Sequence, residues 1–478
     1  MRHWWNSLLS GEISTHVNSS RSFLIEKSIQ KRLGILSSMG SLAIEGKETS
    51  HSPPAQVFIV RDGKSEELIN WKKDIQPLTG KDFFDLRTHL LKRIHLLKPE
   101  IFIFEGKVQV MDTRYFGLNL ISTSPVGALF FHIMIKPQES INSEDHYVIY
   151  HDPDLTMDLF DVHLKSTSLM AINLSTKEIL MIGHLSLGEI KEGIQSLMSI
   201  LLPQQGGLPM GARGFKDHEG NGFLVIEMDK SQDGEDLTND GFIFSGHDQF
   251  CLQGGVVQNL FEGAYLKESG VKEKSNEGLL LKYHQFGNMF EGIQLDEKTR
   301  DPLLETQPDK KEGHFIFSLP DFWQGPYHAL NPSFLFLFYE DFSGVFPLLG
   351  LLEKEEALSS LLYTLHQTPV ALSPLNIYEH LLSQFLDSHS LQVWRLNIGV
   401  EKIKDRSLIP STLREVLKKK GKFHFYQHSI FPILVPTHMD HVSEKFLMPE
   451  KFWKKKHDYR EVALREKKQF AEKLQDVI

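Results

Sequence analysis

The stretch Gly188–Met210, GEIKEGIQSLMSILLPQQGGLPM, decides the fold because it contains a helical pattern followed by residues that end a helix. Apolar side chains recur at helical spacing over Gly188–Leu202, which predicts an amphipathic helix. The glycine and proline residues of Gly206–Pro209 then interrupt the pattern. We therefore predict a domain boundary here, between an N-terminal domain, residues 1–207, and a C-terminal domain, residues 208–478.

The rest of the chain alternates short β-rich runs with helical patterns, which predicts a mixed α/β protein. The predicted strands are Val57–Val60, Ile101–Phe104 and Val108–Met111, and the predicted helices are Phe83–Leu97, Leu375–Leu386 and an amphipathic closing helix over Tyr459–Val477.

Composition narrows the class of protein. The 478 residues are 41% hydrophobic, enough for a sizeable core, and carry a net charge of −10. This acidic balance argues against nucleic acid as the main partner, because phosphate backbones are held chiefly by Lys and Arg. A single cysteine, Cys251, excludes an internal disulfide, and the N-terminal residues lack the apolar core of a secretory signal. No apolar stretch reaches the roughly 18 residues of a membrane span. We expect a cytoplasmic globular protein.

Four more stretches accompany the opening one in a fixed order. They are GSLAIEGKETSHSPPAQVFIVRD (Gly40–Asp62), ALFFHIMIKP (Ala128–Pro137), FEGAYLK (Phe261–Lys267) and VSEKFLMPEKFW (Val442–Trp453). Together they resemble the signature segments of the ATP-dependent phosphoenolpyruvate carboxykinases, from about Ile25 to the C-terminus. The resemblance implies a carboxykinase-like α/β fold, with an N-terminal α/β domain and a P-loop-type, nucleotide-domain-like C-terminal half. It also implies a family reaction in which oxaloacetate is decarboxylated and the enolate is phosphorylated from ATP, with two divalent cations.

The family's phosphate loop, GTGKTTLS, corresponds to Ser231–Thr238, SQDGEDLT, in this chain. The two loop glycines fall on Ser231 and Asp233, the loop lysine on Gly234, and the magnesium-binding hydroxyl on Glu235, beside Asp236. Each like-charge contact with a phosphate at about 4 Å costs roughly 4 kcal/mol at an effective dielectric near 20. The resemblance therefore predicts a degenerate phosphate loop in which ATP is disfavoured in its usual pose.

Other site positions of the family are also changed in this chain. The family's carboxylate-binding arginine falls on His51, its tyrosine on Ser186, its metal-binding lysine on Glu192 and its metal-binding histidine on Gly211. Retained candidates are Lys191, Arg406 and Thr412 for the nucleotide or substrate and Asp248 for the metal.

These replacements favour a pseudoenzyme with a binding or regulatory role that pairs with a protein partner or an active homologue and requires no cofactor. An alternative is a divergent enzyme that acts on another acidic or phosphorylated metabolite through Lys191, Arg213, Lys310 and Asp248. Residual carboxykinase activity is a third interpretation. The acids of Asp229–Asp240 also loosely follow calcium-loop spacing, although an acidic surface loop explains them as well.

Overall fold

A computed structural model describes residues 13–46, 56–71, 75–111, 114–138, 146–155, 168–228, 237, 241–253, 256–268, 283–304, 313–319, 329–330, 332–368, 371–388, 391–399 and 408–475. The chain forms two compact units. Unit 1 comprises Met1–Leu201 and Leu260–Gln324, and unit 2 comprises Leu202–Asn259 and Gly325–Ile478.

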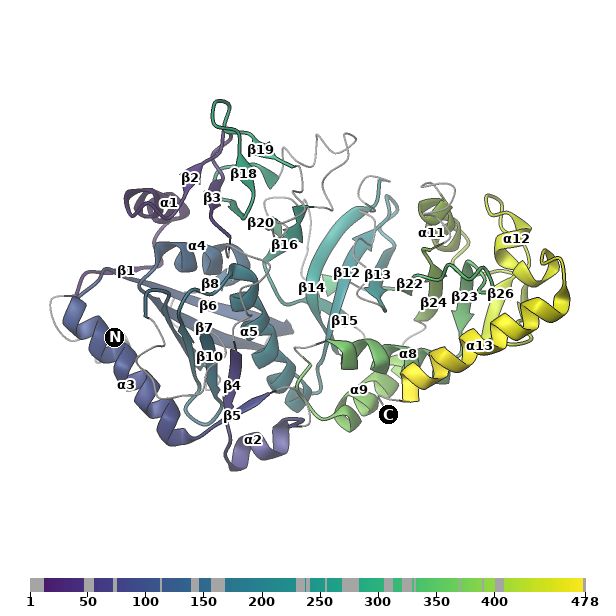
Figure 1. Cartoon of the computed structure of the whole chain (residues 1–478), viewed down its shortest axis with the longest axis horizontal. Helices are drawn as coiled ribbons and strands as arrows, with labels where there is room; N and C mark the ends of the chain where they lie inside the picture. The colour runs from purple at the N-terminus through teal and green to yellow at the C-terminus, as the bar shows by residue number, and fades with distance from the viewer. Residues whose placement is uncertain are drawn as a thin grey trace. The chain divides into compact units, whose positions relative to one another are not determined.

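Unit 1 is built on a nine-stranded mixed sheet of order β1-β6-β7-β9-β11-β10-β4-β5, with β8 paired to β6 (Figure 1). Its strands are β1 (Thr15–Val17), β4 (Gln56–Val60), β5 (Gln76–Leu78), β6 (Ile101–Met111), β7 (Arg114–Ser122), β8 (Lys136–Pro137), β9 (His146–Asp152), β10 (Leu169–Asn173) and β11 (Glu178–Ile182). Its helices are α1 (Arg21–Gln30), α2 (Gly63–Leu68), α3 (Gly80–Leu97), α4 (Pro125–Met134) and α5 (Leu187–Leu201).

The two faces of this sheet bury different helices because side chains alternate along each strand. Ile101 and Ile103 of β6 share a core with Leu86 and Leu90 of α3. Phe104 points the other way, and its ring centroid lies 6.2 Å from that of Phe131 on α4. The sheet is therefore covered on both faces.

Unit 1 also contains a five-stranded sheet of order β16-β20-β17-β3-β2 and a small hairpin, β18-β19. The strands are β2 (Ile35–Leu36), β3 (Leu42–Ile44), β16 (Gly263–Lys267), β17 (Met289–Glu291), β18 (Gln294–Leu295), β19 (Pro302–Leu303) and β20 (His314–Ser318). Backbone pairing of β17 with β3 joins Leu260–Gln324 to the N-terminal part. The compact units thus differ from the predicted domains 1–207 and 208–478, because strand pairing at long range is not readable as a composition break.

Unit 2 is built on a ten-stranded sheet of order β21-β15-β14-β12-β13-β22-β24-β23-β26-β25. Its strands are β12 (Leu208–Lys216), β13 (Gly222–Glu227), β14 (Ile243–Gln253), β15 (Val256–Asn259), β21 (Ala329–Leu330), β22 (Phe334–Tyr339), β23 (Leu349–Leu352), β24 (Gln392–Asn397), β25 (Phe425–Gln427) and β26 (Ile433–Pro436). The central strands β13, β22 and β24 run parallel to one another. Their carboxyl ends therefore lie at one edge of the sheet.

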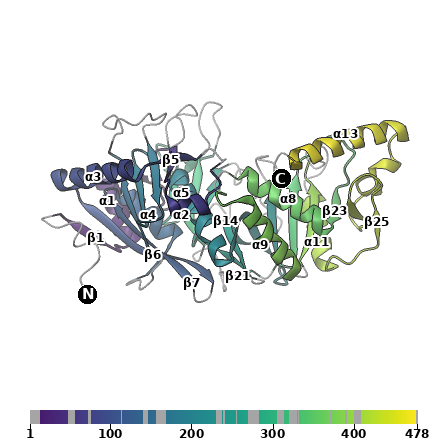
Figure 2. The same ribbon diagram turned by 90° about the horizontal axis from the view of Figure 1, so that it is seen from below.

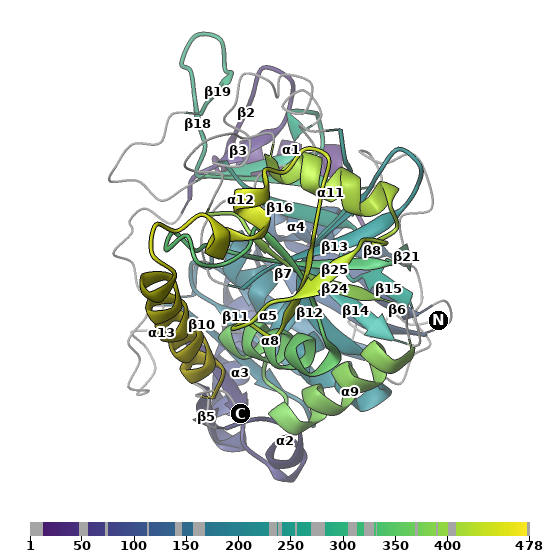
Figure 3. The same ribbon diagram turned by 90° about the vertical axis from the view of Figure 1, so that its right-hand side faces the viewer.

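The helical elements of unit 2 are η3 (Pro203–Gln205), α8 (Lys354–Gln367), α9 (Leu375–Ser388), α11 (Leu408–Lys418), α12 (Glu444–Leu447), η7 (Pro449–Lys451) and α13 (Lys456–Gln475). Helices α8 and α9 pack side by side (Figure 2). Helix α13 runs along the surface of unit 2 (Figure 3). Gly206 ends η3 with a positive φ of 76°, in the left-handed region. Glycine adopts this conformation without steric cost, which explains its presence after α5 and η3.

The prediction of a mixed α/β protein is confirmed. The helix predicted over Gly188–Leu202 is α5, Leu187–Leu201, and the predicted closing helix is α13, Lys456–Gln475. The two predicted strands Ile101–Phe104 and Val108–Met111 form one continuous strand, β6, because it pairs with β7 along nearly its whole length.

Candidate functional site

The start of α5 is fixed by a reciprocal pair of hydrogen bonds. The backbone N–H of Ser186 donates to Glu189 Oε2 at 2.7 Å, and the backbone N–H of Glu189 donates to Ser186 Oγ at 3.2 Å. This arrangement is a capping box, in which side chains satisfy amides that lack a helical partner. The Ser186 hydroxyl therefore acts as a helix cap.

A buried carboxyl group lies against the same helix start. Glu291, at the end of β17, accepts a hydrogen bond from the backbone N–H of Leu187 at 2.9 Å and one from the Tyr265 hydroxyl at 2.6 Å. Burial raises the pKa of the Glu291 carboxyl above its ordinary value, more than these donors lower it. The carboxyl thus ties α5 to β16 and β17.

Lys191 and Glu192 point in different directions from α5, since consecutive helical residues are about 100° apart. Lys191 is buried, and its ammonium Nζ lies 4.8 Å from the centre of the Tyr265 ring, a cation–π distance. Glu192 is exposed to solvent. The structure therefore brings Lys191 together with Tyr265 and Glu291 in unit 1.

The carboxyl edge of β13, β22 and β24 is the candidate ligand edge of unit 2. In open α/β sheets, ligands bind outside the carboxyl ends of parallel strands. Glu227 at the end of β13 is in register with Phe338, and Tyr339 at the end of β22 is in register with Asn397 of β24. The predicted phosphate loop follows β13 in the sequence.

The strands β12 and β14 carry three of the candidate positions. Arg213 on β12 donates from Nη2 to Glu227 Oε1 at 2.7 Å. Gly211 is exposed and lies opposite Gln249, while the Cα of Asp248 lies opposite Ala212, one register position along. The backbone therefore places Gly211 and Asp248 as diagonal neighbours.

Thr412 lies in α11 and is fully buried, where its hydroxyl donates to the backbone carbonyl of Leu408 at 2.8 Å. This is the internal helix bond that threonine side chains commonly make.

Several candidates lie outside the described residues. They are His51, Ser231, Asp233, Gly234, Glu235, Asp236, Arg406 and Lys310, and with them nearly all of the calcium-like spacing over Asp229–Asp240. Within the described ranges, no group of three or more His, Cys, Asp or Glu side chains is arranged to hold a metal ion. Among the helices of those same ranges, none has the length and apolarity to span a bilayer.

The sequence contained one signal that our prediction did not use. Ser186 and Glu189 form the S-x-x-E pattern of a capping box, which would have identified the helix start. Tyr265 and Glu291 were also missed. They lie 26 residues apart and meet only through the pairing of β16 and β17 with β20.

These features define a mixed α/β protein of two compact units, in which a predicted phosphate loop follows a central parallel strand. A family model described as phosphoenolpyruvate carboxykinase matches residues 13–367. The chain therefore belongs to the phosphoenolpyruvate carboxykinase family, and the predicted carboxykinase-like fold is confirmed.

Proteins named phosphoenolpyruvate carboxykinase (ATP) are similar to this chain over nearly its whole length. The protein of Bacillus pumilus is 25% identical, covering 96% of this chain and 92% of the relative. That of Bacillus velezensis is 25% identical, covering 94% and 92%, and that of Brevibacillus brevis is 24% identical, covering 91% and 89%.

The expectation that the chain requires no cofactor is wrong. The family match and full-length relatives whose names specify ATP overturn it. The replacements were predicted to disfavour one pose of the nucleotide, and such a prediction does not imply that the protein requires no nucleotide or metal. ATP and a divalent metal are therefore ligands to be tested with this protein.

Proposed function

We propose that this phosphoenolpyruvate carboxykinase-like protein turns over oxaloacetate poorly or not at all and serves a binding or regulatory role, through a protein partner or an active homologue. The proposal is supported by the residues that correspond, by resemblance, to the family's metal-binding positions: Glu192 in place of lysine and Gly211 in place of histidine.

Phosphoryl transfer depends on cations and donors that are already in place when charge develops on the transferred group. A glycine at position 211 offers no side chain to a metal. An exposed carboxylate at Glu192 reverses the charge of the family's lysine. The Ser186 hydroxyl is engaged in the α5 cap, where the family has a tyrosine. These three positions together support low turnover.

The first test is an assay of phosphoenolpyruvate formation from oxaloacetate, ATP and Mn²⁺, with the Bacillus pumilus relative as the positive control. Loss of one preorganised electrostatic group costs about 10²–10³ in rate, so we expect turnover at least about 10³-fold below the control. A rate within tenfold of the control would contradict the proposal. Thermal shifts with ATP and Mn²⁺ measure binding separately, since a ligand at a hundred times its Kd stabilises by about 2.7 kcal/mol.

A reversion series tests which positions limit turnover. Restoring the loop alone, with S231G, Q232T, D233G, G234K, E235T and D236T, should leave the protein inactive because His51, Glu192 and Gly211 are unchanged. Adding H51R, E192K and G211H should then raise the rate. Activity restored by the loop alone would show that the other replacements do not matter.

A second candidate function is a divergent enzyme for another acidic or phosphorylated metabolite. The buried ammonium of Lys191, held over the Tyr265 ring, favours it because a fixed cation can bind a carboxylate or phosphate. Thermal shifts with a panel of dicarboxylates and phosphorylated acids would identify such a ligand. Its shift should disappear in Lys191→Met and persist in the matched variant Glu192→Gln.

A further inference from the structure

The C-terminal helix α13 is held to unit 2 by few buried side chains. From Lys456 to Glu472, the part of the helix whose side chains are described, Tyr459 and Ala463 are the buried residues, and Leu464 is 48% exposed. Regions with few buried apolar contacts open at a lower free energy than the core. The low burial of its side chains therefore indicates that helix α13 can undock by itself.

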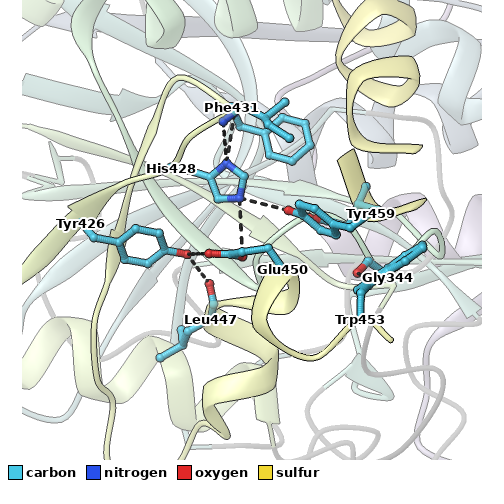
Figure 4. Close-up of polar contacts among 10 residues, drawn as sticks. Gly344, Tyr426, His428, Phe431, Leu447, Glu450, Trp453 and Tyr459 are labelled. Atoms are coloured by element: carbon cyan, nitrogen blue, oxygen red, sulfur yellow. Dashed lines mark hydrogen bonds and ion pairs between the residues drawn. The ribbon is translucent and has the colours of Figure 1, made fainter. Parts of the chain in front are cut away.

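At its N-terminal side, this segment contacts one loop through Tyr459 and Trp453. The Tyr459 hydroxyl donates to the carbonyl oxygen of Val345 at 2.9 Å, and the Trp453 indole N–H donates to the carbonyl oxygen of Gly344 at 3.2 Å. The rings of Trp453 and Tyr459 also pack edge to face, with centroids 5.6 Å apart. Both acceptors belong to the Glu340–Phe346 loop, which follows β22. Figure 4 shows Gly344 of this loop beside Trp453.

A buried imidazole fixes the direction of the Tyr459 hydrogen bond. His428 Nδ1 accepts from the backbone N–H groups of Ile430 and Phe431, at 3.2 and 3.1 Å. The proton must then reside on Nε2, which lies 3.1 Å from the Tyr459 hydroxyl and donates to it. The single hydroxyl proton of Tyr459 is therefore directed at Val345. Figure 4 shows the contact between His428 and Tyr459.

The far end of α13 has a second anchor. The Phe470 ring lies 4.4 Å from the guanidinium carbon of Arg395 on β24. Arg395 is itself fixed by hydrogen bonds from Nη2 to Glu356 Oε1 at 2.8 Å and to Ser360 Oγ at 2.9 Å, both on α8. The helix is thus attached near each end, with the loop contacts at its N-terminal side.

The Glu340–Phe346 loop lies at the carboxyl edge of β22, beside the ends of β13 and β24. Asn397 of β24 fixes the start of the loop, and a serine within the loop makes a local contact. The backbone N–H of Asp341 donates to Asn397 Oδ1 at 3.0 Å, and Ser343 Oγ donates to Asp341 Oδ2 at 2.8 Å. Asn397 Nδ2 also donates to the carbonyl oxygen of Asp341 at 3.2 Å. The contacts from Trp453 and Tyr459 therefore restrain two further carbonyls of the loop, those of Gly344 and Val345.

We propose that Trp453 and α13 form a strap that undocks as a unit and, when docked, holds the Glu340–Phe346 loop in place at the ligand edge of unit 2. Undocking releases both loop carbonyls together, since Tyr459 and Trp453 lie on the same segment. The conformation of this edge is then coupled to the docking of the C-terminal helix.

Hydrogen exchange of the full chain, followed by mass spectrometry, tests the coupling. In the unmodified protein, amides of α13 and of the loop should exchange with the same opening free energy, faster than those of β24. Tyr459→Phe keeps the ring and removes the hydroxyl, so exchange of both segments should accelerate by the same factor, roughly threefold to tenfold. Exchange in β24 should be unchanged.

The matched control is Leu464→Ala, which alters an exposed side chain of the same helix. It should change exchange in the loop by less than a third of the Tyr459→Phe effect. Trp453→Phe provides a second variant if Tyr459→Phe does not fold. Faster exchange in α13 with an unchanged loop would overturn the strap, and so would α13 exchange as slow as that of β24.

Discussion

Two tyrosine–carboxyl pairs, one in each unit, differ in the direction in which the protein shifts the carboxyl pKa. Tyr265 donates to Glu291 in unit 1, and Tyr426 donates to Glu450 Oε1 at 3.2 Å in unit 2. The pKa of Glu291 is raised, whereas that of Glu450 is lowered. A tyrosine donor alone therefore does not decide the charge state of a buried carboxyl group.

The surroundings explain the difference. Glu291 is 5% exposed, and the backbone amides and the Tyr265 hydroxyl that donate to it are neutral, so burial prevails and disfavours the charged form. Burial also acts on Glu450, but its side chain is 27% exposed and the imidazole Nε2 of His428 lies 3.7 Å from its Oε2. The imidazole and the tyrosine lower the pKa of Glu450 more than burial raises it.

Removal of each carboxyl group gives the largest contrast. Glu291→Ala would remove the acceptor that the buried Leu187 N–H and the Tyr265 hydroxyl share, at about 1–3 kcal/mol for each bond. We expect the free energy of unfolding to fall by about 3–5 kcal/mol, measured by urea denaturation. Glu450→Ala should cost about 1–2 kcal/mol, since Tyr426 also contacts the carbonyl of Leu447 at 3.0 Å. Equal losses would show that burial does not separate the two pairs.

The surroundings of these two pairs also show what could and could not be predicted from the sequence. Helix α5 and helix α13 were predicted to within a few residues because their apolar spacing is local. The contact of Glu291 with the α5 start joins residues 104 positions apart, and no local pattern encodes it.

The candidate site was predictable only in part. Resemblance identified Ser186, Lys191 and Glu192 as neighbours in sequence, but their separation into a cap, a buried cation and an exposed carboxylate depends on how α5 packs against β16. Packing of this kind is decided by tertiary contacts and not by residue type.

Substitution of each tyrosine by phenylalanine measures how much one hydroxyl contributes to stability in each pair. Tyr265→Phe keeps the ring under Lys191 but leaves Glu291 Oε2 without its 2.6 Å donor, and we expect a loss of about 2 kcal/mol. Tyr426→Phe should cost about 1 kcal/mol because Glu450 is partly solvated. Urea denaturation of both variants measures the difference, and a larger loss in Tyr426→Phe would reverse our ranking.

The smallest effect, and the most specific, is the pH dependence of stability. A raised folded pKa at Glu291 gives stability that is fully present below the ordinary value of 4.5 and is lost as pH rises through the folded pKa. The lowered folded pKa of Glu450 gives stability that is present above 4.5 and is lost as pH falls through that lower pKa. Each slope is at most about 1.4 kcal/mol per pH unit. In Glu291→Gln, the loss of stability above pH 4.5 should therefore disappear. In Glu450→Gln, the loss of stability below pH 4.5 should disappear. Urea midpoints measured at a series of pH values test both. If both substitutions changed the pH dependence in the same direction, the two surroundings would not shift the two carboxyl pKa values in opposite directions.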